Sequence, residues 1–389
     1  MENPWPLRYL LNQYTSTHTW IKYQDDDRIN LFRILGEVNL ELGVYFEFQI
    51  QPGGSQQQAF QTDLNHIELA DKLGYDYAWL AELHFSPERS VVSSPFLAAC
   101  AAIHRTKNIR IGTAVSVLPL NNPVRIAEDV ATLDHLSKGR FELGIGRSGA
   151  PRGYVGYGIP YQESKARFND CLEILIKAWT QDNFSHTSKF YKFDNVCVFP
   201  KPYQTPHPPI RNAATSVETF LSSAKKGFPI FVSLRGSLAS LKERIDIYKK
   251  VWADMGHQGQ PNICARIPTF VSDTQEKAET IARDSAMNFY RNFVANLNEP
   301  VPGLSCKENT ERLARSKRMR NMTYKDFLLT EGVVGDPQFV GERLLAIKTE
   351  YSLTGFMIEA NFGGLIPSDN VSHSLRLFKT LVAPRLLSA

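Results

Sequence analysis

Arg147 is the residue of this chain whose type and setting best suit the binding of an anion. It lies in the segment 144–149, Gly-Ile-Gly-Arg-Ser-Gly, which follows an apolar run and matches G-x-G-x-x-G. A dinucleotide-binding loop of that pattern opens a helix at once and is followed by an acid about 20 residues on. Here Pro151 and three more glycines follow, and Asp170 falls within a predicted helix. We reject the dinucleotide interpretation and keep an anion site whose glycines allow close approach, with a surface arginine in a flexible loop as the alternative.

A second signal for anion binding lies in the segment 215–219, Thr-Ser-Val-Glu-Thr, which follows another apolar run and opens a predicted helix. Thr215 or Ser216 can cap this helix, and the nearby Glu218 resembles the acid of a capping box. The free N–H groups of a helix start also attract phosphate, although capping alone explains the pattern equally well. Because Arg147 and this helix start follow consecutive predicted strands, both could hold one phosphate.

His84 is the candidate for proton transfer, because it ends the second predicted strand in the run Glu82-Leu83-His84 and a histidine titrates near neutral pH. A structural role is at least as common for a single histidine. The sequence contains neither the H-E-x-x-H pattern of zinc hydrolases nor the G-x-S-x-G elbow of α/β-hydrolases. The small residues of segment 112–115 could admit a flat ring system or simply pack in the core.

The elements that must position these residues are eight apolar strand candidates, most of them followed by a helix. Strands that are apolar throughout are typical of parallel sheets covered on both faces. The count and the spacing favour an α/β fold of the (β/α)8 TIM barrel type, with a doubly wound open sheet as the alternative. The predicted strands span 42–48, 77–80, 109–117, 141–145, 210–213, 229–233, 265–271 and 355–359.

Three segments fall outside this repeating pattern. Residues 1–41 have poor periodicity and are predicted to form an N-terminal extension to a barrel spanning 42–389. Residues 189–199 are predicted to form a hairpin. Residues from about 298 to 335 are polar and are predicted to form an irregular insertion before the last strand–helix unit.

The composition is that of an ordinary globular chain of 389 residues, with a net charge of only +4. The densest basic stretch, 312–320, has no interleaved aromatic residues, so we expect a solvated loop and no nucleic-acid partner. The five cysteines are scattered without C-x-x-C spacing, which favours a reducing compartment over disulfides or zinc. No apolar run approaches a membrane span, and we expect a cytoplasmic protein.

Taken together, several segments resemble the bacterial luciferase-like flavin monooxygenases. The resemblance covers roughly residues 42–385 and is most specific where Ser-Lys-Gly-Arg-Phe at 137–141 follows Pro-Val-Arg at 123–125. The other matching segments are 79–85, 112–114, 117–119, 127–129, 133–134 and 354–364.

This resemblance implies a TIM barrel that binds reduced FMN (FMNH2) supplied by a separate flavin reductase. It implies reaction with O2 to a flavin C4a-hydroperoxide and transfer of one oxygen atom to a small organic substrate, such as a specialised metabolite or an aliphatic compound. Segment 298–335 would be the lid that keeps water from the reaction. The resemblance also makes a homodimer plausible.

The resemblance assigns roles to individual residues. Arg147 would hold the FMN phosphate together with Ser216, Thr219 and the backbone at Thr215. Ala114–Val115 would be the non-prolyl cis peptide that lies under the flavin ring.

Three positions depart from the luciferase pattern, and one of them is Thr215, where luciferases have an acid. Leu83 stands where luciferases have their catalytic histidine, so that Glu82 and His84 remain as the catalytic candidates. Gly146 stands where luciferases have a reactive cysteine facing the flavin, which is expected to open room beside the ring. The missing histidine keeps open a non-catalytic flavin-binding or partner subunit, and a deazaflavin-dependent oxidoreductase on the same fold is a further alternative.

Overall fold

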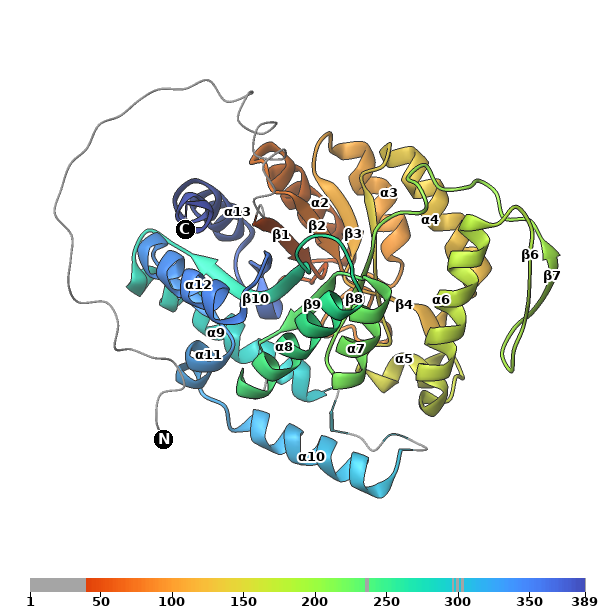
Figure 1. Cartoon of the computed structure of the whole chain (residues 1–389). Helices are drawn as coiled ribbons and strands as arrows, with labels where there is room; N and C mark the ends of the chain where they lie inside the picture. The colour runs from red at the N-terminus through yellow and green to blue at the C-terminus, as the bar shows by residue number, and fades with distance from the viewer. Residues whose placement is uncertain (1–39, 235–237, 296, 299–300, 302–303, 389) are drawn as a thin grey trace.

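Eight parallel strands form the centre of the molecule and close into a barrel, because β12 near the end of the chain pairs with β1 at its start (Figure 1). The computed structural model describes residues 40–388 except 235–237, 296, 299–300 and 302–303. Positions 1–39 of the expected N-terminal extension therefore lie outside the described residues. In spatial order the barrel strands are β1 (Glu41–Phe46), β2 (Tyr77–Leu80), β3 (Arg110–Thr113), β5 (Phe141–Gly146), β8 (Ile210–Ala213), β9 (Ile230–Ser233), β10 (Ile263–Val271) and β12 (Gly355–Glu359). Spatial order equals chain order, which confirms the (β/α)8 barrel and excludes the open sheet.

Helices surround the barrel and connect successive strands (Figure 1). Their starts carry the capping residues that the sequence offers: Asn122, for example, accepts a hydrogen bond from the Val124 N–H at 2.9 Å, and Pro123 occupies the first turn of α4. The helices are α2 (Gln56–Lys72), α3 (Pro95–Arg105), α4 (Pro123–Ser137), α6 (Ser164–Thr180), α7 (Val217–Lys226), α8 (Leu238–Asp254), α9 (Gln275–Ala295), α12 (Pro337–Tyr351), α13 (Ser368–Leu377) and α14 (Ala383–Leu387).

Trp79 fills the middle of the barrel because its neighbours have no side chains there. A Cβ atom at Gly112 would lie 2.2 Å from the Trp79 ring, and one at Gly43 would lie 2.7 Å from it. Phe231 packs edge-on against the same ring, with 4.8 Å between the centroids. The interior is therefore a packed core, and only the two ends of the barrel can differ in function.

The third predicted strand is interrupted rather than continuous. The structure divides it into β3 and β4 (Ser116–Val117), with the cis peptide Ala114–Val115 between them. The Thr113 hydroxyl donates to the Gly144 carbonyl at 2.7 Å, and the Ala114 N–H donates to the Leu80 carbonyl at 2.7 Å. These bonds hold the interruption against both neighbouring strands.

A hairpin of β6 (Phe184–Thr187) and β7 (Lys192–Val196) extends beyond α6, away from the barrel (Figure 1). The sequence predicted a hairpin over 189–199 and missed its first strand, which begins at Phe184. The four residues of β6 alternate between buried and exposed, and His186 is tied to Asp170 of α6 at 2.6 Å. A strand this short and this polar has no apolar run that marks it in the sequence.

The insertion between β10 and β12 lies where the sequence placed it, but the expectation of an irregular segment was wrong for most of it. It contains α10 (Cys306–Arg320), α11 (Tyr324–Thr330) and β11 (Val333–Gly335). Helix α11 begins at a capping box of Thr323 and Asp326 and buries Phe327 against aromatic residues of α9. Helix α10 is so polar that it shows no apolar stripe, which is why periodicity did not reveal it.

Among the described residues, no helix is both long enough and apolar enough to cross a membrane.

Candidate active site

The predicted anion-binding residues lie together at the rim formed by the carboxyl ends of the strands. Arg147 directly follows β5, and Thr215 follows β8, the strand that pairs with β5 in parallel. Both segments therefore leave the barrel at the same end and next to each other. In TIM barrels this end carries the functional loops.

Ser216 is the N-cap of α7. Its hydroxyl accepts a hydrogen bond from the Thr219 N–H at 3.3 Å and lies 2.9 Å from the Thr219 hydroxyl. The carbonyl of Thr215 accepts a hydrogen bond from the Arg244 guanidinium of α8. The helix start thus combines the exposed Ser216 and the half-buried Thr219, the positive end of the helix dipole and a neighbouring cation, which together suit a phosphate.

The charge of Arg147 reaches this helix start. Glu218, in the first turn of α7, is bound to Lys165 at 2.5 Å. Its hydrogen bond to Lys165 lowers the pKa of this carboxyl, and the charge of Arg147 lowers it further. Tyr154, which is fully buried, donates to the Arg147 carbonyl and fixes the backbone of the loop. Arg147 and the start of α7 therefore follow paired neighbouring strands, and the charge of Arg147 acts on the first turn of α7.

The cis peptide Ala114–Val115 lies beside this site, and its Val115 side chain points toward β5. A Cβ atom at Gly146 would lie only 2.5 Å from the nearer Val115 methyl group. The expectation that Gly146 opens room was therefore wrong: Val115 already occupies that space. The small residues Ala114 and Gly146 nevertheless leave this part of the rim without large side chains.

The sequence pattern of the family described as luciferase-like monooxygenase matches residues 40–353, which is most of the chain. The chain belongs to this family. It is 28% identical to the alkanal monooxygenase alpha chain of Photorhabdus luminescens over 344 residues, which cover 86% of this chain and 94% of the relative. Family membership confirms the resemblance and assigns the chain to the luciferase-like flavin monooxygenases.

Solved structures of other proteins confirm the fold of this luciferase-like monooxygenase. The oxygenating constituent of 3,6-diketocamphane monooxygenase from a Pseudomonas putida plasmid, in complex with FMN, has a TM-score of 0.74 at 20% identity and covers 90% of this chain and 99% of its own. An F420-dependent secondary alcohol dehydrogenase has a TM-score of 0.68 at 15% identity, covering 90% and 99%. At these identities the likeness concerns the fold alone.

His84 is held on both sides of its ring. Its Nε2 lies 2.9 Å from a Glu82 oxygen, and its Nδ1 lies 3.3 Å from the Tyr157 hydroxyl. The His84 side chain is 8% exposed. Both ring nitrogens thus have a partner in the protein, and these contacts fix the orientation of the ring. Leu83, at the position of the luciferase histidine, is half-buried.

Glu82 connects His84 to the interrupted strand. Its carboxylate accepts hydrogen bonds from the Val117 N–H at 3.0 Å and from the Asn121 amide at 3.3 Å, besides its contact with His84. It is almost fully buried. Glu82 therefore ties the end of β2 to β4, just beyond the cis peptide.

An ionic wall of Tyr45, Glu47, Arg89, Arg266 and Glu359 borders the rim at the other side of the barrel. Arg266 donates to Glu359 and to Glu47, at 2.9 Å each, and its guanidinium carbon lies 3.6 Å from the centre of the Tyr45 ring. Burial opposes ionisation of Glu47, but the charges of Arg89 and Arg266 outweigh it and lower the pKa of this carboxyl to about 2.

The ionic wall meets the inserted segment at a small cavity. Ser233, Leu234, Arg266 and Pro268 line it from β9, its end and β10, and Glu331 lines it from the end of α11. The inserted segment thus contributes a side chain to the barrel mouth. This contact is the arrangement expected of a lid.

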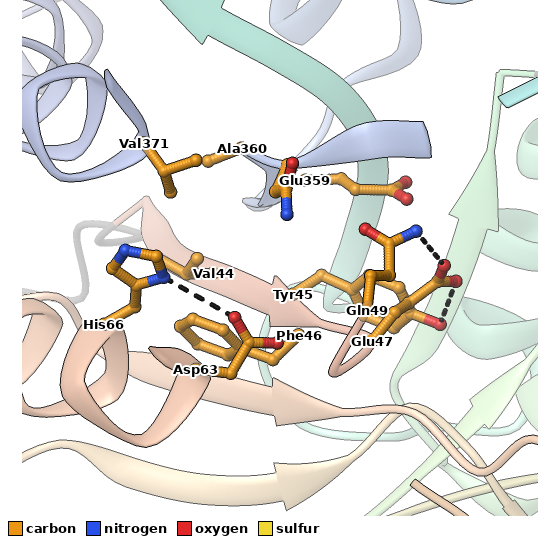
Figure 2. A pocket seen from close by; sticks show the side chains of 11 residues that line it. Val44, Tyr45, Phe46, Glu47, Gln49, Asp63, His66, Glu359, Ala360 and Val371 are labelled. Atoms are coloured by element: carbon orange, nitrogen blue, oxygen red, sulfur yellow. Dashed lines mark hydrogen bonds and ion pairs between the residues drawn. The ribbon is translucent and has the colours of Figure 1, made fainter. Parts of the chain in front are cut away.

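A second small cavity lies where β1 and β12 end, between the ionic wall and α2 (Figure 2). Tyr45 and Gln49 both donate to Glu47 on one side, and on the other His66 faces Asp63 at 3.5 Å. It has room for a water molecule but not for an organic substrate.

Sequence reasoning missed the ionic wall. Its one local signal is Arg266, a charged residue in the middle of the otherwise apolar strand β10. Its partner Glu47 is 219 positions away in the chain. No spacing rule links residues so far apart.

Proposed function

We propose that this chain is an FMNH2-dependent monooxygenase that consumes O2 and a small organic substrate. The balanced reaction takes FMNH2, O2 and the substrate to FMN, water and a product that has gained one oxygen atom. Reduced flavin supplies the electrons that activate O2, and a separate flavin reductase supplies the reduced flavin. The observation that carries the proposal is that Arg147 and the start of α7 follow the paired strands β5 and β8, at one rim of a barrel that belongs to the luciferase-like monooxygenase family.

Arg147, Ser216, Thr219 and the backbone at Thr215 would hold the FMN phosphate. The hydroxyl groups of Ser216 and Thr219 lie at a helix start, and Arg147 adds a charge that can make hydrogen bonds to phosphate oxygens. The residues present therefore fit a mononucleotide phosphate. Ala114, Val115 and Gly146 would form the surface against which the flavin ring rests.

The inserted segment 298–335 would act as the lid over the bound reactants. Its Glu331 reaches the cavity beside Arg266, and Phe327 anchors α11 to the barrel side. Exclusion of water strengthens the polar interactions within the mouth and protects reactive species. His84 and Glu82 would keep the end of β2 aligned with the cis peptide, and they remain our catalytic candidates.

A homodimer through the helices near β2 and β3 is part of the proposal. Leu97 in the first turn of α3 is 74% exposed, which is unusual for a leucine. An apolar side chain so placed gains from burial in an interface.

The decisive experiment measures FMN affinity and product formation together. Arg147→Ala should weaken FMN binding by about 1.5–3 kcal/mol, because it removes a charge-assisted hydrogen bond. Arg152→Ala is the matched control, since Arg152 lies in the same loop but pairs with Glu88 at 2.8 Å. Affinity is measured by titration of flavin fluorescence. Equal affinities of wild type and Arg147→Ala would remove Arg147 from the site.

Product formation is tested in a substrate screen with FMN, NADH and a flavin reductase, read as products that gain one oxygen by mass. Binding of FMN with no product over a broad screen would favour a flavin-binding partner subunit. Binding of the deazaflavin F420 in preference to FMN would favour the third alternative, which the fold of the F420-dependent dehydrogenase supports.

A further inference from the structure

Helix α10 of the proposed lid carries the surplus positive charge of this chain. Its 15 residues include six cationic and two acidic ones, a surplus of four, and the whole chain has a net charge of +4. The rest of the sequence is therefore electrically balanced. Such a concentration of charge in one short helix calls for a physical role beyond solubility.

The cations of this helix face solvent. Lys307, Arg315, Lys317 and Arg318 are exposed, as is Lys325 on α11. Within the described part of the chain none of these five has a carboxylate partner. Arg315 also lies over the Phe293 ring at 5.2 Å. We call these five residues the cationic lid face.

Helix α10 is joined to the segment that follows α9, and the end of α9 contacts the loop after β5, where Arg152 donates to the Ala295 carbonyl at 3.5 Å. Arg320 and Ser316 each donate to Asn298, at 2.5 Å, just beyond the end of α9. Burial lowers the pKa of Arg312, and an electrostatic interaction with Tyr161, in the loop that follows β5, opposes that shift. In Figure 1 the helix runs along the edge of the molecule between α11 and α5 (Pro151–Gly156). The loop after β5 is also the loop of Arg147.

Acidic residues near this loop are already neutralised. Glu88 pairs with Arg152 at 2.8 Å, Glu163 pairs with Lys189 at 2.8 Å, and Glu218 pairs with Lys165. Glu311 offsets part of the charge of α10, and the cationic lid face keeps a surplus of positive charge. This surplus produces a positive potential at the entrance to the phosphate site.

We propose that the cationic lid face is an entry surface for the anionic flavin, which it attracts from solution and directs to Arg147. This inference rests on the proposed function, because it assumes that FMN or FMNH2 is the ligand. A flavin delivered by free diffusion carries a doubly charged phosphate, and fixed charges near a site raise association rates of such ligands. The cationic lid face acts on the association rate and leaves the contacts of bound flavin to Arg147 and α7.

The test is the association rate of oxidised FMN, measured by stopped-flow quenching of flavin fluorescence. At an ionic strength of about 20 mM, Lys317→Glu/Arg318→Glu should slow association about threefold to tenfold and change the dissociation rate by less than about twofold. The difference should vanish near 0.5 M salt, where screening lengths fall to a few ångströms. Riboflavin, which has no phosphate, should associate equally fast with both proteins.

The matched control is Lys225→Glu/Lys226→Glu, which changes net charge by the same amount. These lysines are exposed in the last turn of α7, at the opposite end of that helix from Ser216. Their reversal should change the association rate by less than about twofold. An equal loss in this control would overturn the inference, because net charge alone would then explain the effect.

Other outcomes separate this inference from the proposed function. Unchanged FMN association in the lid variant overturns the entry surface while the proposed function stands. Slower turnover with a reductase but unchanged FMN association also overturns it, in favour of docking of the reductase. A wild-type protein that binds no FMN overturns both.

Discussion

Each end of this barrel holds an arginine between two carboxylates, and the two arginines differ in their exposure to solvent. At the amino ends of the strands, Arg211 binds Glu142 at 2.9 Å and Glu41 at 3.0 Å. At the carboxyl ends, Arg266 lies between Glu47 and Glu359 at similar distances. The Arg211 side chain is 2% exposed, whereas that of Arg266 is 19% exposed.

The difference follows from what covers each arginine. Arg211 lies beneath Trp79 and Phe231, with its guanidinium carbon 5.4 Å and 5.3 Å from the centres of their rings, and the Asn262 amide satisfies a further N–H. Arg266 instead lines a cavity that Glu331 of the inserted segment also borders. One end is closed by a buried ionic cluster, while the ionic wall at the other end stays partly exposed at a cavity.

The largest expected effect is the loss of stability when Arg211 is replaced at the closed end. Arg211→Met removes the nearest cation from the buried Glu142 and from the half-buried Glu41, and leaves Glu142 only the more distant Arg110 at 3.8 Å. This loss should lower the free energy of unfolding by about 3 kcal/mol. Arg266→Met should cost less, because Glu47 keeps Arg89 and water can reach the cavity. Urea unfolding of both variants measures the comparison.

The control for this experiment is the double variant Arg211→Met/Glu142→Gln. Removing one of the stranded charges should restore part of the lost stability. Equal losses for Arg211→Met and Arg266→Met would show that the two ends are equally closed.

Lowering the pH should change the stability contributions of Glu47 and Glu41, at the two ends of the barrel, in opposite directions. Charges on Arg89 and Arg266 lower the folded pKa of Glu47 to about 2, so its contribution is present above pH 4.5 and is lost as pH falls toward 2. That contribution amounts to about 3 kcal/mol. Burial, added to by the charge of Glu142 and only partly offset by Arg211, raises the pKa of Glu41. The contribution of Glu41 is therefore present below pH 4.5 and is lost as pH rises through its folded pKa.

Glu47→Gln and Glu41→Gln test these signs when unfolding is measured at about pH 3 and about pH 6. The stability difference between wild type and Glu47→Gln should shrink at the lower pH, since the wild type has lost part of its advantage. The corresponding difference for Glu41→Gln should grow. If both stability differences shrank at the lower pH, or both grew, the assignment of a lowered pKa to Glu47 and a raised pKa to Glu41 would be contradicted.

The sequence predicted those features of each end that arise from residues close together in the chain. The eight strands and the cap at Ser216 were predicted because apolar runs and capping residues are local patterns. The closure of β12 onto β1 and the pairing of Glu47 with Arg266 join residues hundreds of positions apart. No periodicity reports such pairs, so both ionic clusters came only from the structure.

The lid and the rim show two further limits. Helix α10 is strongly polar, and its few apolar residues do not form the apolar face whose 3.6-residue period would predict a helix. At Gly146 the sequence showed a missing side chain but not that Val115 fills the space. A glycine indicates that another group can approach the backbone closely, but the sequence does not show which residue does so.

The smallest expected effect concerns a helix start at the functional end. Ser216→Ala removes the side-chain cap of α7 and should lower the free energy of unfolding by about 1 kcal/mol. Ser55→Ala is the matched control, because Ser55 caps α2 in the same way through the Gln58 N–H. Thermal unfolding of both apo proteins should show similar losses.

Flavin binding then separates capping from phosphate recognition. If the Ser216 hydroxyl also contacts the FMN phosphate, Ser216→Ala should weaken FMN binding by about 0.5–1.5 kcal/mol. Ser55→Ala should leave FMN affinity unchanged. Equal affinities in both variants would restrict Ser216 to a structural cap. Equal losses in both would mean that loosening any helix start at this end disturbs the site, and the functional end would then be defined by its rigidity rather than by Ser216.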